Sequence, residues 1–142
     1  MPDEIPSETR VLNYPYELFD PKSWLNFVDM PPFSRSWSKL GLDDDDLRAI
    51  EMAIMLDPKM ANVIPGTGGI RKIRISPLNE DVGKSGGLRV WYSYYEEYGL
   101  VALFAVYAKG VTEDLSATVK KKLKELNDQN KKLLSSRKVD KV

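Results

Sequence analysis

The pattern of apolar and polar positions predicts an irregular start, followed by a strand and a helix. Residues 1–22 show no apolar period and are expected to form an N-terminal extension. A strand is predicted over Trp24 to Met30, and Pro31-Pro32 should end it because proline cannot donate to a β-ladder. Helical spacing then runs from Phe33 to Leu40.

A second helix is predicted to start near Asp43, whose carboxylate can cap the free backbone amides of the first turn. Asp44 to Asp46 then lie at the positive end of the helix, where acidic side chains are favoured. Pro58 is expected to end it. Helical spacing predicts a buried face made of Leu47, Ile50 and Ile54.

Three strands are predicted after a glycine-rich turn at Pro65 to Gly69: Ile70 to Ser76, Leu88 to Tyr95, and Leu100 to Lys109. The connections between them are too short for helical crossovers, which favours an antiparallel meander. A last helix is expected over Thr112 to Leu134. Its apolar residues recur at helical spacing: Leu115, Val119, Leu123 and Leu126.

Together these elements predict an α+β fold, in which N-terminal helices pack on a small curved antiparallel sheet and a C-terminal helix follows. A chain of 142 residues, 42% of them hydrophobic, has material for one core. We therefore expect one domain over residues 23–134, preceded by the extension at 1–22 and followed by a tail at 135–142.

Two residue types are missing from the chain, and their absence narrows its possible chemistry. Without cysteine it has no disulfide, no thiolate nucleophile and no cysteine-ligated metal. Without histidine it lacks the commonest general base near neutral pH. Any catalysis must therefore use carboxylates, Lys, Arg, Tyr, Ser or Thr.

Charge is distributed unevenly, although the formal net charge is zero. Residues 1–70 hold about 6 basic and 12 acidic side chains, and residues 71–142 about 15 and 9. The second half is a candidate basic surface, although the lysines of the last helix also fit a simple solvated face. The longest apolar run, Leu100 to Ala108, is too short to span a membrane and the start lacks a signal-peptide pattern, so a cytoplasmic location is expected.

Two glycine-rich stretches resemble nucleotide-binding motifs but miss required positions. Gly83-Lys84-Ser85 would end a P-loop, yet Leu78 stands where the opening glycine should be. The stretch Gly66 to Gly69 would begin a dinucleotide fingerprint, yet its sixth position is Arg71. Both stretches are better explained as turns that need positive φ.

Cations on the predicted strands give the strongest functional signal. Alternate residues of a strand share a face, so Lys72 and Arg74 point one way and the neighbouring isoleucines face the core. If adjacent strands pair, one face would gather Lys72, Arg74, Arg89, Tyr107 and Lys109. Such a set would bind an anion, although separate cations on a solvated sheet face are also common. The aromatic residues of the middle strand either stack on bases or, more commonly, pack in a core: Trp91, Tyr92, Tyr94 and Tyr95.

Two stretches resemble the RelE/HigB family of type II toxins, in particular its HigB-like branch. They are Val63 to Arg74 (VIPGTGGIRKIR) and Gly83 to Tyr92 (GKSGGLRVWY). Two shorter runs are similar to the last strand of the family and the start of its final helix, namely Tyr107-Ala108-Lys109 and Glu113-Asp114-Leu115. The resemblance covers Phe33 to about Leu126 and leaves out residues 1–22.

The resemblance implies a RelE-like toxin that cleaves messenger RNA in the ribosomal A site, as an endoribonuclease without metal or other cofactor. It also implies a cognate antitoxin of the helix-turn-helix class as partner, and no membrane association. The catalytic residues carried over by position are Lys72, Arg74, Arg89, Tyr107 and Lys109. The supporting RNA-binding residues are Arg71, Lys84 and Tyr92.

The implied reaction suits a chain that lacks histidine. The 2′-hydroxyl attacks the adjacent phosphorus, and arginine forks such as those of Arg74 and Arg89 fit the charge that grows on the phosphate. The base would have to be Lys72, Lys109 or Tyr107, and neighbouring cations would favour the neutral form of a lysine. The identities of the general acid and base stay open.

Two other functions remain open. A ParE-like protein shares the fold but inhibits a protein target such as DNA gyrase without cutting RNA, and it has no obvious need for the cation cluster. A degenerate RNA-binding module would keep the phosphate contacts and lack cleavage. A near-neutral pI of about 6.3 and Gly110, at a position where some relatives have arginine, favour this third function.

Overall fold

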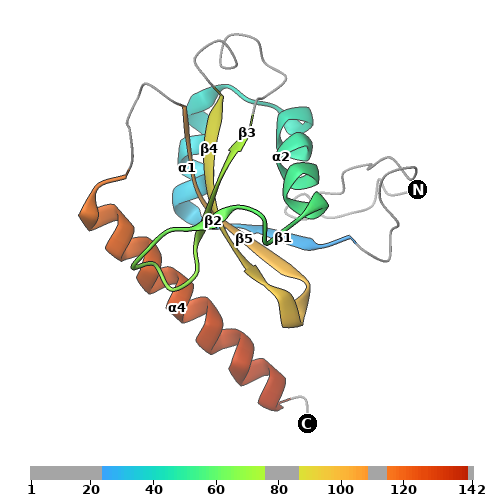
Figure 1. The fold of residues 1–142 in the computed structure, drawn as a ribbon, viewed down its shortest axis with the longest axis vertical. Coiled ribbons are helices and arrows are strands. Elements are labelled where there is room, and N and C mark those ends of the chain that lie inside the picture. Colours follow the sequence, from blue (N-terminus) through green and yellow to red (C-terminus); the bar gives the residue numbers. More distant parts are fainter. Residues whose placement is uncertain (1–23, 76–86, 109–114, 141–142) are drawn as a thin grey trace.

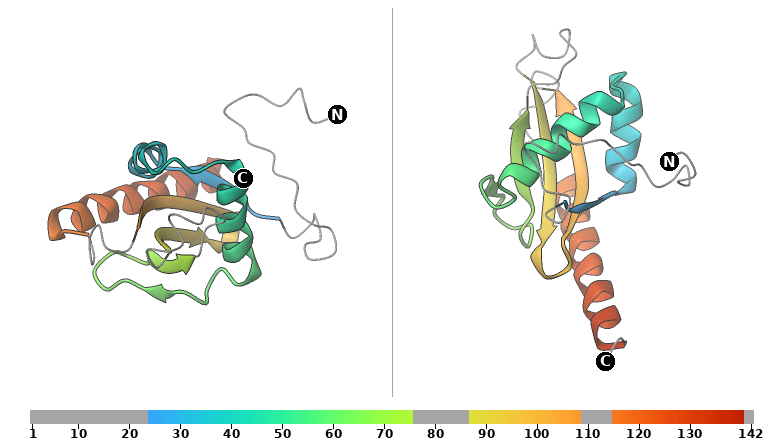
Figure 2. Two further views of the ribbon diagram at one scale, coloured as in Figure 1. Left: turned by 90° about the horizontal axis from the view of Figure 1, so that it is seen from above. Right: turned by 90° about the vertical axis from the view of Figure 1, so that its right-hand side faces the viewer.

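The computed structural model describes residues 24–75, 87–108 and 115–140. In these ranges the chain forms a five-stranded sheet, with two helices on one face and a long helix on the other (Figures 1 and 2). The predicted α+β class is confirmed. The predicted extension at 1–22 lies outside the described residues.

The sheet has the strand order β1-β5-β4-β3-β2. Its centre is the predicted antiparallel meander of β3 (Arg71–Ile75), β4 (Leu88–Tyr95) and β5 (Leu100–Ala108). At one edge, β1 (Asn26–Asp29) adds to β5 in parallel orientation. At the other edge, β2 (Asn62–Val63) is a short strand that the sequence pattern did not predict.

The first two helices begin where local chemistry favours a helix start. α1 (Pro31–Leu40) starts slightly earlier than predicted, because its prolines fill the first turn, where a missing amide leaves no hydrogen bond unmade. α2 (Asp44–Leu56) has the predicted cap, and Asp43 Oδ1 accepts a 3.0 Å hydrogen bond from the Asp46 amide. That hydrogen bond is the main reason why the pKa of the Asp43 carboxyl is lowered.

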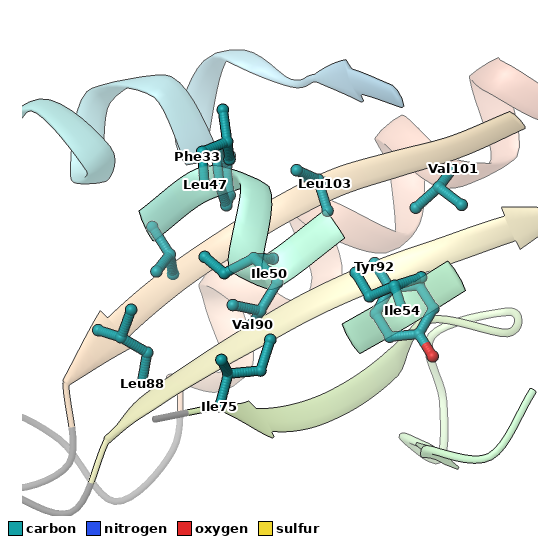
Figure 3. Close-up of a cluster of buried hydrophobic side chains, with 11 residues drawn as sticks. Phe33, Leu47, Ile50, Ile54, Ile75, Leu88, Val90, Tyr92, Val101 and Leu103 are labelled. Atoms are coloured by element: carbon teal, nitrogen blue, oxygen red, sulfur yellow. The ribbon is translucent and has the colours of Figure 1, made fainter. Parts of the chain in front are cut away.

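The first core lies between the sheet and the pair α1 and α2 (Figure 3). Its α2 side is the face predicted from the sequence, since Leu47, Ile50 and Ile54 are all buried. The sheet contributes alternate residues of β3 and β4, as the two-residue period of a strand requires, and residues of β5 on the same face. These residues include Ile75, Leu88, Val90, Tyr92, Val101 and Leu103.

The last helix, α4 (Ala117–Asp140), covers the opposite face of the sheet and packs Leu123 into a second core. Its start is capped by Ser116, whose hydroxyl accepts from the Val119 amide at 3.2 Å. The predicted apolar stripe is wrong at Val119, which is 42% exposed. The C-terminal end of α4 extends past the β4–β5 hairpin (Figures 1 and 2). None of the helices in the described part of the chain is long and apolar enough to cross a membrane.

A buried amide fixes α4 on the sheet. Asn127 is fully buried, and its Oδ1 accepts a 2.7 Å hydrogen bond from the Tyr95 hydroxyl. Its Nδ2 donates to the carbonyls of Thr67 at 3.3 Å and Gly68 at 3.2 Å, in the glycine-rich turn. Gly68 has a φ of +75°, and a Cβ there would lie 3.3 Å from Asp128 Oδ1. The turn therefore needs glycine for its backbone conformation, and a Cβ there would also require the Asp128 side chain to shift slightly.

We expect Asn127→Ala to lower the free energy of unfolding by about 1–3 kcal/mol, because buried polar groups would be left without partners. Urea unfolding measures this loss. Gln129→Ala, on the exposed side of the same helical turn, is the matched control and should change stability little. Equal losses in the two variants would mean that the buried amide contributes nothing specific.

Candidate functional site

β3 presents two cations on the sheet face that carries α4. Lys72 and Arg74 are exposed, whereas Ile75 is buried and Ile73 packs against the first core on the other face. The alternation predicted from the sequence is therefore confirmed in this strand.

Strand register places three side chains next to one another across β3, β4 and β5. Arg74 pairs with Arg89, and Arg89 pairs in turn with Tyr107. Residues paired in this way share a face, and their Cβ atoms lie about 4.5–5.5 Å apart. We call Arg74, Arg89 and Tyr107 the arginine row. Lys72 lies two residues further along β3, opposite Trp91.

The two arginines of the row concentrate positive charge at one place, and like charges directly opposite each other disfavour each other in a sheet. Arg74 and Arg89 stand in this relation. A phosphate bound between the two guanidinium groups would replace repulsion with charge-assisted hydrogen bonds. The arginine row is therefore suited to bind a phosphate group.

Tyr107 forms the β5 end of the row and keeps only 7% of its surface exposed. Its hydroxyl accepts a 3.0 Å hydrogen bond from the indole Nε1 of Trp91. The two rings meet edge to face, with their centroids 6.5 Å apart. This contact fixes the Tyr107 side chain on the face of the sheet that carries the arginines.

Core packing, the commoner of the two roles that the sequence indicates for Trp91, is confirmed by its full burial, but its hydrogen bond to Tyr107 is not predicted by the sequence. The strand period did contain a signal, because Arg89 and Trp91 are two residues apart and must share a face. What the sequence lacked was the register that brings Tyr107 within reach of the indole.

Two predicted RNA-binding residues, Arg71 and Tyr92, lie on the opposite face of the sheet from the arginine row. Arg71 Nη1 donates to the carbonyls of Lys59 at 2.8 Å and Ala61 at 2.7 Å. Tyr92 is fully buried, its hydroxyl donates to the Pro58 carbonyl at 2.8 Å, and burial raises its pKa. Both side chains hold the turn that follows α2, so the structure does not bring them to the site.

The remaining two predicted site residues, Lys84 and Lys109, lie outside the described residues. Both flank strands that carry the row. Lys84 precedes β4, and Lys109 directly follows the last residue of β5.

A pocket of about 340 Å³ lies at the other end of β4 and is lined in part by Ser93 to Glu96. Arg89 and Tyr95 are six positions apart, which separates the two ends of the strand by about 20 Å. The cations of this pocket already have partners. Lys59 pairs with Glu96 at 2.6 Å, which raises the pKa of the lysine, and Lys131 donates to the Gly68 carbonyl. We place the anion site at the arginine row because strand register sets Arg74 and Arg89 opposite each other there.

No family model matches the sequence. The structure of a double mutant of the E. coli toxin RelE in the free state is similar to this chain, with 19% sequence identity and a TM-score of 0.44. The match covers 63% of this chain and 87% of the RelE chain. A chain of the intact E. coli RelBE toxin–antitoxin complex has 19% sequence identity and a TM-score of 0.43, and the match covers 61% of this chain and 96% of that one. The isolated E. coli RelE toxin has 17% sequence identity and a TM-score of 0.43, and the match covers 72% of this chain and 98% of the toxin. At these identities and TM-scores the similarity carries no weight for function, which has to come from the side chains themselves.

Removing one arginine of the pair should make the free protein slightly more stable. In Arg74→Gln the repulsion with Arg89 is lost, so we expect the free energy of unfolding at low salt to rise by about 0.2–1 kcal/mol. Millimolar phosphate should raise the Tm of the natural protein more than that of this variant. Arg35→Gln, on the exposed surface of α1, is the control and should behave like the natural protein. An unchanged phosphate response in Arg74→Gln would contradict an anion site at the row.

Proposed function

We propose that this chain is the toxin of a type II toxin–antitoxin system, a metal-independent endoribonuclease that cuts messenger RNA in the ribosomal A site. The observation that carries the proposal is the arginine row, in which strand register sets Arg74 opposite Arg89 and Arg89 opposite Tyr107. The sequence stretches Val63 to Arg74 and Gly83 to Tyr92, which resemble RelE/HigB toxins, support the same assignment.

In the proposed reaction the 2′-hydroxyl of one nucleotide attacks the adjacent phosphorus. The bond from phosphorus to the 5′-oxygen breaks, leaving a cyclic phosphate and a 5′-hydroxyl. Arg74 and Arg89 bind the non-bridging oxygens and stabilise the charge that they gain in the transition state. Two proton transfers complete the reaction, one from the 2′-hydroxyl to a base and one to the leaving 5′-oxygen.

Two of the residues assigned to these transfers, Lys72 and Tyr107, come from the same face of the sheet. Lys72 is exposed two residues from Arg74, where it can bind a flanking phosphate or take the 2′-proton. Lys109 is the other candidate base, and it follows β5 directly. Tyr107 is the candidate proton donor. No metal or other cofactor takes part in this scheme.

The partners belong to the same proposal. The substrate is messenger RNA held on the ribosome, and a cognate antitoxin of the helix-turn-helix class would mask the arginine row. This assignment rests on the resemblance of the two sequence stretches to type II toxins. A small adjacent gene that encodes a helix-turn-helix protein would support it.

Primer extension on a defined message in a purified translation system tests the nuclease, with and without ribosomes. We expect cuts that need ribosomes, and a loss of about a hundred- to a thousandfold in cleavage rate for Arg89→Ala, or about 2.7–4 kcal/mol of transition-state stabilisation. Arg35→Ala on α1 is the control and should cut normally. If the message stays intact while translation stops, the nuclease assignment is wrong and gyrase inhibition becomes the next function to test.

RNA binding without cleavage is the second candidate, and the 7% exposure of Tyr107 favours it, because a nearly buried hydroxyl has little access to substrate. Binding of a cleavage-resistant 2′-deoxy oligonucleotide at several salt concentrations measures the phosphate contacts alone. Each phosphate contact contributes about 0.7 to the slope of log K against log salt for a single strand. We therefore expect Lys72→Gln and Arg74→Gln each to reduce the slope by about 0.7. Strong salt dependence together with no cleavage would establish the second candidate.

A further inference from the structure

We propose that residues 11–19 dock on an apolar surface at the C-terminal end of α2 and so form part of the folded domain. This surface, which we call the methionine surface, consists of Met52, Met55 and Leu56 of α2 and Met60 of the turn that follows. It belongs to the side of the sheet that carries α1 and α2, opposite the arginine row. The inference goes beyond the proposed function and does not depend on it.

The methionine surface leaves unusually large apolar side chains in water. Leu56 is 70% exposed and Met60 is 72% exposed, the two highest values among the large hydrophobic residues that the structure describes. Leu56 follows Met52 by four residues, so the two lie on the same side of α2. Exposed apolar side chains that gather at one place mark an interaction site.

The turn that carries Met60 is held by hydrogen bonds on both sides of this residue. Arg71 Nη1 donates to the carbonyls of Lys59 at 2.8 Å and Ala61 at 2.7 Å. The Met60 amide itself donates to the Asp57 carbonyl at 3.1 Å. The backbone is therefore fixed, and it keeps the Met60 side chain pointing outward.

The chain enters the described structure beside the methionine surface. Trp24, the first residue described, belongs to the same apolar cluster as Met52 and Met55. The Leu25 amide donates to Met55 Sδ at 3.5 Å. Five positions separate Phe19 from Trp24, and an extended chain covers up to about 3.3–3.6 Å per residue. Residues 11–19 can therefore reach the end of α2 without a long linker.

The composition of residues 11–19 fits this surface. Large apolar or aromatic side chains make up six of these nine residues: Val11, Leu12, Tyr14, Tyr16, Leu18 and Phe19. Methionine side chains adapt to irregular partners, and their sulfur atoms make favourable contacts with aromatic rings. The cluster of Trp24 with Met52 and Met55 already combines an aromatic ring with thioethers. Tyr14, Tyr16 and Phe19 would extend the same kind of contact to Leu56 and Met60.

The covalent link favours this segment over a separate partner as the occupant. A short flexible linker gives a tethered segment an effective concentration of about millimolar at its site. A separate protein would have to compete with that concentration. The methionine surface is therefore assigned to residues 11–19 of the same chain.

Photo-crosslinking in the full chain tests the docking. The variants are Leu56→p-benzoylphenylalanine and Met60→p-benzoylphenylalanine. The control is Val119→p-benzoylphenylalanine, at an exposed position of α4 on the other face of the sheet. Isotopically light and heavy proteins are mixed before irradiation, so that crosslinks within a chain can be distinguished from crosslinks between chains. We expect positions 56 and 60 to crosslink to residues 11–19 of the same chain, and position 119 not to do so.

Oxidation of Met60 by hydrogen peroxide gives a second measurement, because exposed thioethers oxidise faster than covered ones. In the double variant Leu18→Ser and Phe19→Ser, we expect Met60 to form its sulfoxide several-fold faster than in the natural protein. Ile5→Ser, which lies in the extension but outside residues 11–19, is the control and should leave this rate unchanged.

Three results would overturn the inference. Crosslinks from positions 56 and 60 that join mainly light to heavy chains would assign the surface to a second copy. Crosslinks from position 119 to residues 11–19 would instead place the segment on the α4 face. Equal rates of Met60 oxidation in the natural protein and the double variant would mean that the segment does not cover the surface. None of these measurements involves RNA, so their outcome is separate from that of the proposed nuclease function.

Discussion

The register of β3, β4 and β5 is the constraint on which the site depends. It is set by apolar pairs on the α1 and α2 face, where Ile73 pairs with Val90, and Val90 pairs in turn with Val106. A slip of one residue would turn a whole strand over and drive Arg89 into that core, at a cost of several buried apolar side chains. Compared with this cost, the repulsion between two opposed arginines is small. The core therefore holds the cations together.

Much of this arrangement could be read from the sequence, because strand alternation is a local property. The period alone placed Lys72 and Arg74 on one face, and capping chemistry alone placed the start of α2 at Asp43. The stripe of α4 could not be read in the same way. Its buried face includes Asn127, which a search for apolar residues leaves out. The predicted apolar stripe therefore includes Val119, which is exposed, and lacks Asn127, which is buried. A buried amide can be recognised only when its partners are known.

Arg71 and Tyr92 show the opposite case. The strand period places them away from Lys72 and Arg74, whereas resemblance to a toxin family predicts that they bind RNA with those residues. Arg71 is adjacent to Lys72 in a strand and so must face the other way. Tyr92 pairs with Arg71 and shares its face. The two side chains hold the turn after α2 by its carbonyl oxygens, which is a structural role. Positions taken from motifs need to be checked against the strand period before chemistry is assigned to them.

The pairing of β4 with β5 is interrupted once, since Trp91 pairs with Ala105 whereas Tyr92 pairs with Leu103, which leaves Phe104 as an extra residue. A chain without Phe104 would lose packing but keep every other residue of β5 on its present face. Deletion of a β5 residue outside the bulge would instead move the side chains of part of the strand to the opposite face of the sheet. When homologous sequences are aligned with this one, a one-residue gap in β5 belongs at position 104, because a gap placed elsewhere would assign the residues between the two positions to the wrong face of the strand.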